Sequence, residues 1–100
     1  MAQTPEGKVK DAIKKILAFY KVYYVMPMGT GYGNSGPLDF SACVNGRYLG
    51  VEAKAGKGKT TALQDRHIEQ IRAAGGIVLV INELNLGELG RTLYDLTSNN

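Results

Sequence analysis

The sequence predicts a single α/β domain, residues 1–100. A helix precedes a mixed β-sheet with an antiparallel hairpin, and a second helix and a buried strand follow, in the order αβββαβ. Three observations predict this class. Apolar residues recur at helical spacing near the N-terminus, Asn45-Gly46 separates two strand-like runs, and the apolar run "IVLVI" follows a second helical pattern. A chain of 100 residues has room for one domain with one core.

The first helix is predicted to begin at Thr4 and to run to about Tyr20. Thr4 suits the N-cap and Pro5 the first helical position. The apolar residues at helical spacing are Val9, Ile13, Ile16, Leu17 and Tyr20. Residues 22–26, "VYYVM", are β-branched and aromatic and predict a short strand. A glycine-rich loop, residues 29–37, follows it.

Asn45-Gly46 predicts a tight hairpin between the next two strands. A type I′ turn needs positive φ at both central residues, and Asn and Gly tolerate it best. A two-residue loop sets the register, in which the opposed pairs are Val44 and Arg47, Ala42 and Leu49, and Phe40 and Val51. One face of the hairpin is then apolar and is predicted to be core: Phe40, Ala42, Val44, Leu49, Val51 and Ala53.

The other face of the hairpin brings charged residues together. Asp39 lies opposite Glu52, with Cβ atoms roughly 4.5 to 5.5 Å apart, and Lys54 projects from the same side. Opposed carboxylates repel, so a divalent cation is expected to offset the repulsion. Carboxylate oxygens, waters and phosphate oxygens suit magnesium or manganese. The alternative is that Lys54 simply pairs with one acid on an exposed sheet face.

The second half of the chain predicts a helix, a strand and a further helix. The first of these helices runs from Thr60 or Thr61 to Ala74, with an apolar stripe of Leu63, His67, Ile68 and Ile71. We interpret His67 as a packing residue, because no further histidine or cysteine accompanies it. Residues 77–81 predict a buried, central strand. Leucines at helical spacing within residues 84–96 predict a helix that closes the core or makes a dimer contact.

Composition favours a globular domain without a membrane partner. Hydrophobic residues make up 44% and charged residues 21% of the chain, and no apolar run approaches the roughly 18 residues of a membrane span. No N-terminal apolar segment indicates a secretory signal, so a cytoplasmic location is expected. The single cysteine, Cys43, fits a reducing compartment and is expected to be a packed thiol. Lysine clusters suit either a polyanion or a solvated helix face.

Residues 53–60, "AKAGKGKT", also fit a relaxed P-loop pattern between a strand and a helix. Such a loop normally follows the first strand of a parallel sheet, whereas the strand before this loop is the second arm of a hairpin. Asn82 also stands where a metal-binding Asp is expected after the apolar strand. A nucleotide-binding protein of the P-loop type is therefore the less favoured alternative.

The charged motifs carry a family resemblance. "GPLD" at residues 36–39, "VEAK" at residues 51–54 and Gln64 in the next helix resemble the VRR-NUC branch of the PD-(D/E)xK nucleases. The order of elements over residues 6–81 is also similar, and the chain looks closest to the small stand-alone viral members. The resemblance implies a restriction-endonuclease-like fold and hydrolysis of DNA phosphodiester bonds.

The resemblance also implies roles for individual residues. Asp39, Glu52 and the backbone carbonyl of Ala53 would hold Mg²⁺ or Mn²⁺, and Lys54 would orient or help to deprotonate the attacking water. A metal at such a site polarises the phosphate and lowers the pKa of water. Glu6 and Gln64 would complete the site, although a first-turn Glu also favours the helix dipole and Gln64 could be solvated. Lys57 and Lys59, on the loop after the site, are candidates for phosphate contacts.

The predicted function is a metal-dependent DNA endonuclease. A domain this small covers little of a duplex, which favours a homodimer with two active sites. Four-way junctions are then plausible substrates, as for the junction resolvases that the small viral members resemble, and a viral enzyme of this kind would act in the host cytoplasm. The alternative is a non-catalytic nucleic-acid-binding module in which the same lysines bind phosphate. Dependence on metal separates the two.

Overall fold

The computed structural model describes residues 3–27 and 37–98, and confirms the predicted α/β class. The elements are α1 (Pro5–Phe19), β1 (Tyr23–Val25), β2 (Phe40–Val44), β3 (Arg47–Ala53), α2 (Ala62–Ala73), β4 (Ile77–Ile81) and α3 (Leu86–Ser98). The helix predicted for residues 84–96 is therefore present, starting and ending slightly later. Most of the predicted glycine-rich loop lies outside the described residues.

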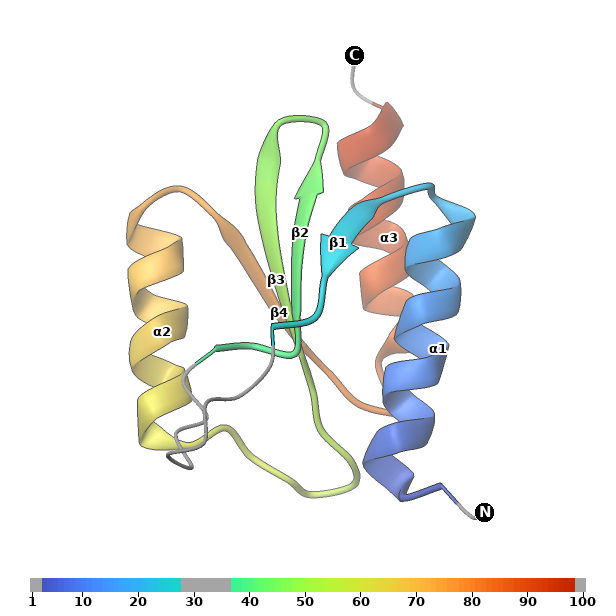
Figure 1. Cartoon of the computed structure of the whole chain (residues 1–100), viewed down its shortest axis with the longest axis vertical. Coiled ribbons are helices and arrows are strands. Elements are labelled where there is room, and N and C mark those ends of the chain that lie inside the picture. The colour runs from blue at the N-terminus through green and yellow to red at the C-terminus, as the bar shows by residue number, and fades with distance from the viewer. Residues whose placement is uncertain (1–2, 28–36, 99–100) are drawn as a thin grey trace.

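The four strands form one mixed sheet between two layers of helices. Its order is β1-β2-β3-β4, with antiparallel pairing up to β3 and parallel pairing of β3 with β4. Helices α1 and α3 lie on one side of the sheet and α2 lies on the other (Figure 1). Strand β3 is thus both the second arm of the hairpin and the first strand of a parallel β3-α2-β4 unit.

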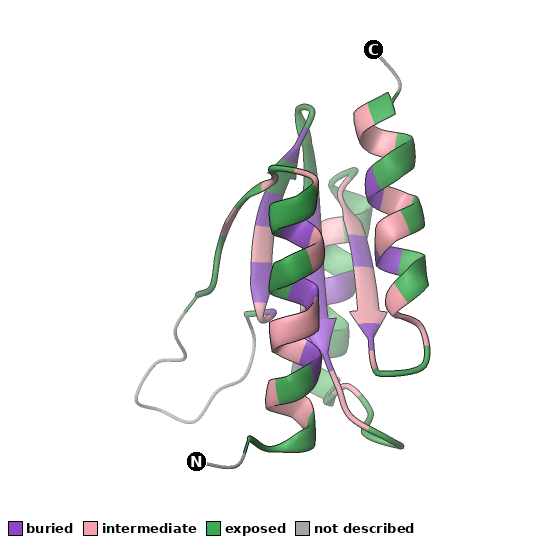
Figure 2. Ribbon diagram, turned by 90° about the vertical axis from the view of Figure 1, so that its right-hand side faces the viewer, coloured by how far each residue is buried: buried purple, intermediate pink, exposed green. Residues whose placement is uncertain are grey.

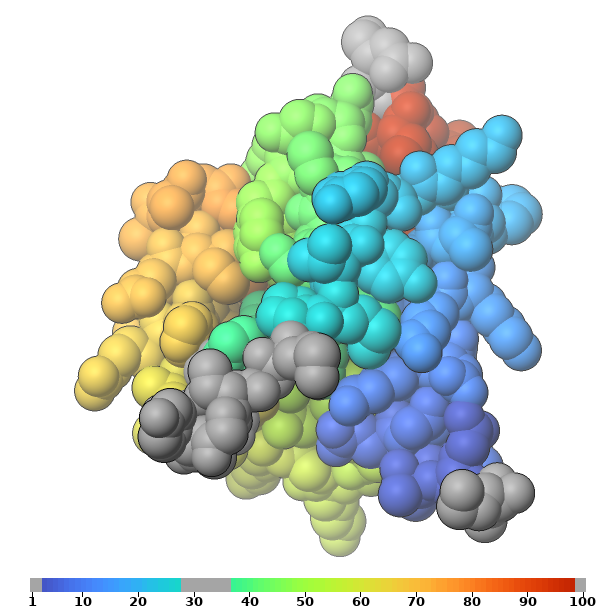
Figure 3. Space-filling view, in the orientation of Figure 1, coloured from blue at the N-terminus to red at the C-terminus, as the bar shows by residue number. Residues whose placement is uncertain are grey.

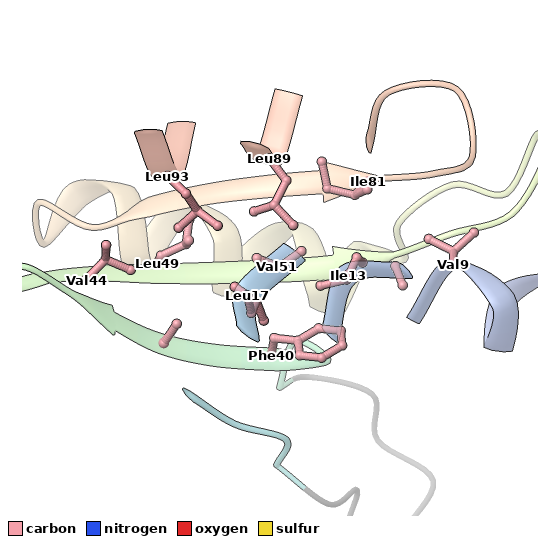
Figure 4. Close-up of a cluster of buried hydrophobic side chains, with 12 residues drawn as sticks. Val9, Ile13, Leu17, Phe40, Val44, Leu49, Val51, Ile81, Leu89 and Leu93 are labelled. Atoms are coloured by element: carbon pink, nitrogen blue, oxygen red, sulfur yellow. The ribbon is translucent and has the colours of Figure 1, made fainter. Parts of the chain in front are cut away.

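The main core lies between the sheet and the pair α1 and α3 (Figure 4). Helix α1 begins as predicted, because the Thr4 hydroxyl accepts the N–H of Gly7 at 3.0 Å and Pro5 occupies the first turn. The predicted hairpin register is confirmed, with Phe40 opposite Val51. All six residues of the predicted core face are buried, and they pack against Val9, Ile13, Leu17, Leu89 and Leu93.

A smaller core lies between the sheet and α2. It joins Leu38, Ile68 and Val78, with Ile71 and Val80 packed against them. Gly50 makes room for it, since a Cβ atom there would lie 2.8 Å from Leu38 Cδ1. In Figure 2, where burial is coloured, the strands between the helices are largely purple and pink.

The prediction that β4 is central is wrong, because β4 lies at the end of the strand order among the described residues. Its apolar run arises because both of its faces are covered. Ile77 and Leu79 pack against the main core, whereas Val78 belongs to the smaller one. A continuous apolar run in a strand therefore indicates that both of its faces are covered. It does not indicate how many strands pair with it.

The outer edge of β4 is closed by side chains. The N–H of Lys54 donates to the Ile81 carbonyl within the β3–β4 ladder, so the carbonyls of Val78 and Val80 point away from β3. Arg72 Nη2 donates to the Val78 carbonyl at 3.1 Å, and Asn85 Nδ2 donates to the Val80 carbonyl at 3.0 Å. These bonds occupy acceptors that another strand would otherwise pair with.

Two further expectations about packing need correction. Leu63 was predicted to lie in the apolar stripe of α2, but it is exposed and the buried residues of that helix are Gln64 and Ile68. Cys43 was predicted to be packed, but it is exposed. It stands between Tyr23 and Tyr48 in the register, and both tyrosines are also exposed. His67 is half-buried, as a packing residue would be.

One remaining expectation is that no segment of the chain spans a membrane. Within residues 3–27 and 37–98, no helix combines the length and the apolar character that a bilayer crossing needs.

Candidate functional site

The hairpin brings Asp39 and Glu52 together at its open end, away from the turn that joins β2 and β3. Asp39 directly precedes β2, and Glu52 is the penultimate residue of β3. Each carboxylate is bonded to the other strand: the N–H of Asp39 donates to Glu52 Oε1 at 3.1 Å, and the N–H of Ala53 donates to Asp39 Oδ2 at 2.9 Å. The backbone therefore holds two like charges side by side.

Helix α2 supplies a third group to this cluster. The Thr61 hydroxyl and the Gln64 side chain form a capping box, in which Gln64 Oε1 accepts the N–H of Thr61 at 3.0 Å. This bond leaves the amide nitrogen of Gln64 free to donate to Glu52 Oε2 at 2.8 Å. Gln64 is thus a buried partner of Glu52, and the expectation that it could be a solvated helix residue is wrong.

Lys54 also contacts Glu52. Its Nζ lies 3.4 Å from Glu52 Oε2, and only 15% of its side chain is exposed. The alternative expectation, that Lys54 pairs with an acid, therefore describes a real contact, but on a largely buried part of the sheet. Glu52 itself is 2% exposed.

The electrostatics of Glu52 follow from this burial. Desolvation raises the pKa of its carboxyl above the ordinary value, and the nearby charge of Asp39 raises it further. The bond from the Asp39 N–H and the ammonium of Lys54 oppose this effect but do not cancel it. The ionised Glu52 is therefore under strain that an additional positive charge would relieve.

Lys10 is a cluster residue that the sequence analysis missed. Its Nζ lies 3.5 Å from Asp39 Oδ1 and 3.7 Å from Glu6 Oε2. Glu6 is therefore linked to Asp39 through Lys10, which forms an ion pair with each of them. The signal in the sequence was the spacing, because residues four apart share a helix face. The docking of α1 beside Asp39, which completes the bridge, is not visible in the spacing.

Lys57 and Lys59 lie on the loop between β3 and α2, and both are exposed. In the space-filling view this loop projects at the lower end of the molecule, beside the first turns of α1 (Figure 3). The two lysines are therefore placed at the same end of the domain as the acid cluster.

The same loop has the text pattern of a P-loop, but its backbone already has a partner. The N–H of Gly56 donates to both carboxylate oxygens of Glu83, at 3.1 and 3.0 Å. The backbone N–H of Glu83 itself and, to a smaller extent, this bond lower the pKa of that carboxyl. The hydroxyl of Thr60, the last residue of the pattern, donates to Asp65 Oδ1. Groups that a phosphate would use are occupied by the chain's own side chains.

The donor set fits a hard divalent cation in chemical type. Asp39 and Glu52 offer carboxylate oxygens, each with more than one acceptor site. In an extended strand the N–H and C=O of one residue point to the same side, so the Ala53 carbonyl points toward Asp39, as its N–H does. Within the described part of the chain, no three His, Cys, Asp or Glu residues are grouped to hold a metal. Waters and substrate oxygens would have to complete the shell, as Mg²⁺ commonly allows.

Comparison with known proteins adds no assignment: no family model matches the chain, and no curated protein matches it.

Proposed function

We propose that this chain is a divalent-metal-dependent DNA endonuclease, active as a homodimer, with branched DNA such as a four-way junction as a favoured substrate. The observation that carries the proposal is the pair Asp39 and Glu52, each bonded to the other's strand, with Lys54 beside them. Opposed carboxylates repel and are costly unless a cation offsets the repulsion, and an amine beside them suits a phosphate. The motifs "GPLD" and "VEAK", which resemble those of VRR-NUC nucleases, support the same function.

The proposed roles follow from the positions of the groups. Asp39, Glu52 and the Ala53 carbonyl would hold Mg²⁺ or Mn²⁺, and the bound ion would supply Lewis-acid polarisation of the phosphate. Lys54, which contacts Glu52, would steady an attacking water and the negative charge that develops on the phosphate. Gln64 fixes one oxygen of Glu52, so it positions the carboxylate. Lys57 and Lys59 would contact the DNA backbone outside the reacting centre.

One observation favours the alternative, a non-catalytic nucleic-acid-binding module. Every buried polar side-chain atom in the described residues already has a hydrogen-bond partner within the chain. The cluster is therefore satisfied without any ligand, and the exposed lysines alone would give salt-sensitive binding to phosphate. The two functions differ in their requirement for metal.

The test is cleavage of labelled linear, flap and four-way-junction DNA with Mg²⁺, Mn²⁺ or a chelator. Asp39→Asn keeps an oxygen for the Ala53 N–H but removes the charge, so cleavage is expected to disappear while the fold persists. Asp95→Asn, on the exposed part of α3, is the matched control and is expected to cut like the wild type. Binding without any cut, unchanged by chelator, would overturn the nuclease and favour the binding module. Cutting that survives in Asp39→Asn would show that this carboxylate is not the centre.

A further inference from the structure

The ammonium of Lys10, on helix α1, contacts the acid cluster. It lies between Asp39 Oδ1, at 3.5 Å, and Glu6 Oε2, at 3.7 Å. About a third of the Lys10 side chain is exposed, compared with a fifth of the Asp39 side chain. A partly exposed lysine thus bridges the two acids and lies beside Asp39 Oδ1.

The other carboxylate oxygens are committed to the protein. Asp39 Oδ2 accepts the N–H of Ala53. Glu52 Oε1 accepts the N–H of Asp39, and Oε2 accepts the Gln64 amide beside Lys54. Of the four carboxylate oxygens of Asp39 and Glu52, Asp39 Oδ1 is the one for which the structure shows an ion pair alone. A second cation that approaches Asp39 therefore meets the ammonium of Lys10 first.

We propose that Lys10 is a displaceable counter-ion that competes with the divalent cation for Asp39. This inference rests on the proposed function, because it assumes that the acid cluster binds the metal. Two cations at one carboxylate repel, so the metal can bind Asp39 Oδ1 only when the Lys10 ammonium moves away. The lysine stem is long and flexible, and its release costs one partly exposed ion pair.

The displaced ammonium has a second use. Once the ammonium has moved away from the carboxylates, a DNA phosphate that enters the cluster would bind it. A phosphate that binds Lys10 removes the competitor of the metal, so DNA and metal are expected to strengthen each other's binding. Linkage requires this coupling to be reciprocal. Lys10 would then keep the metal weakly bound until substrate arrives.

The test is calorimetric titration of Mg²⁺ or Mn²⁺ into the wild type, Lys10→Met and Lys14→Met without DNA. Lys14→Met is the matched control, because it removes the same charge from the same helix while its partner is Asp11, at 3.8 Å. Removal of the competing ion pair is expected to tighten metal binding by about two- to fivefold in Lys10→Met. Lys14→Met is expected to bind metal like the wild type. Circular dichroism melts establish that each variant is folded.

The possible outcomes separate the inference from the function beneath it. Metal binding that is equally tight in the wild type and both variants would overturn the role of Lys10 and leave the nuclease standing. Weaker binding in Lys10→Met would make Lys10 a supporting residue instead of a competitor, which also overturns the inference. No metal binding by any form, together with no metal-dependent cleavage, would remove the proposed function itself. The titrations of Lys10→Met and Lys14→Met are then repeated with uncleavable DNA present. The DNA-induced gain in metal affinity should be smaller in Lys10→Met than in Lys14→Met.

Discussion

The two faces of the hairpin formed by β2 and β3 differ in what they contribute. The core face is uniform: its six residues are apolar and at most 3% exposed. The other face changes along the strands. Acids lie at one end, Gly50 lies beneath Leu38 and Ile71 in the middle, and Cys43 is exposed near the turn. One register fixes both faces of the hairpin, so burial of the apolar face also holds the opposed acids in place. The free energy gained by packing the core offsets the repulsion between the two acids.

The core face is expected to carry the largest effect on stability. Phe40 is fully buried and its ring lies 5.7 Å from that of Tyr24, so Phe40→Ala should lower the free energy of unfolding by about 3–5 kcal/mol. Phe19 is 78% exposed, and the same substitution there should change the value by no more than about 0.5 kcal/mol. Urea denaturation measures both. Equal losses would contradict the assignment of Phe40 to the main core.

Gln64 is expected to show a smaller effect from the site face. Gln64→Ala removes the capping-box bond to Thr61 and leaves Glu52 Oε2 without its amide donor. Together these losses should cost about 1–3 kcal/mol of unfolding free energy. Gln70→Ala, at an exposed position of the same helix, is the control and should be close to neutral. If both variants melt like the wild type, Gln64 is not a structural partner of Glu52.

Glu52 is expected to show the smallest effect on stability, and its size depends on pH. The folded state raises the pKa of Glu52 above its ordinary value of 4.5, because burial and Asp39 disfavour the ionised form. The stability that protonated Glu52 contributes is complete below that value and is lost as pH rises through the folded pKa. Glu52→Gln cannot ionise, so its stability should gain on the wild type between pH 4 and pH 7.

The measurement is a series of urea titrations of the two proteins across that pH range, with chelator present so that no cation neutralises the site. A difference in unfolding free energy that stays constant, or that shrinks as pH rises, would show that the ionised Glu52 is well accommodated. Addition of Mg²⁺ at pH 7 should raise the stability of the wild type more than that of the variant, because ligand binding to the native state stabilises it.

The hairpin could be predicted from the sequence because its signals are local. Asn45 and Gly46 do adopt positive φ, at 51° and 84°, and the alternation of apolar residues on both sides of them admits one register. That register placed Asp39 opposite Glu52 without any knowledge of the rest of the chain. Thr4 was likewise recognisable as the start of a helix, and the start of α2 was narrowed to Thr60 or Thr61, of which Thr61 is the N-cap.

The features that could not be predicted depend on how distant elements dock. The apolar run of β4 gives no information about whether a further strand pairs beyond it, and here Arg72 and Asn85 close that edge. Lys10 looked like any lysine of an amphipathic helix until α1 was placed beside Asp39. Cys43 looked like a small packed residue, but it is exposed together with its register neighbours Tyr23 and Tyr48.

The exposure of Cys43 makes the site observable. The chain has a single thiol, so one maleimide reaction labels one known position. Cys43 and Asp39 project from the same face of β2, four residues or about 13 Å apart at the rise of a strand. A fluorophore at Cys43 would therefore report on DNA or Mn²⁺ at the acid cluster from within the quenching range of a paramagnetic ion, without a second cysteine to confuse the signal.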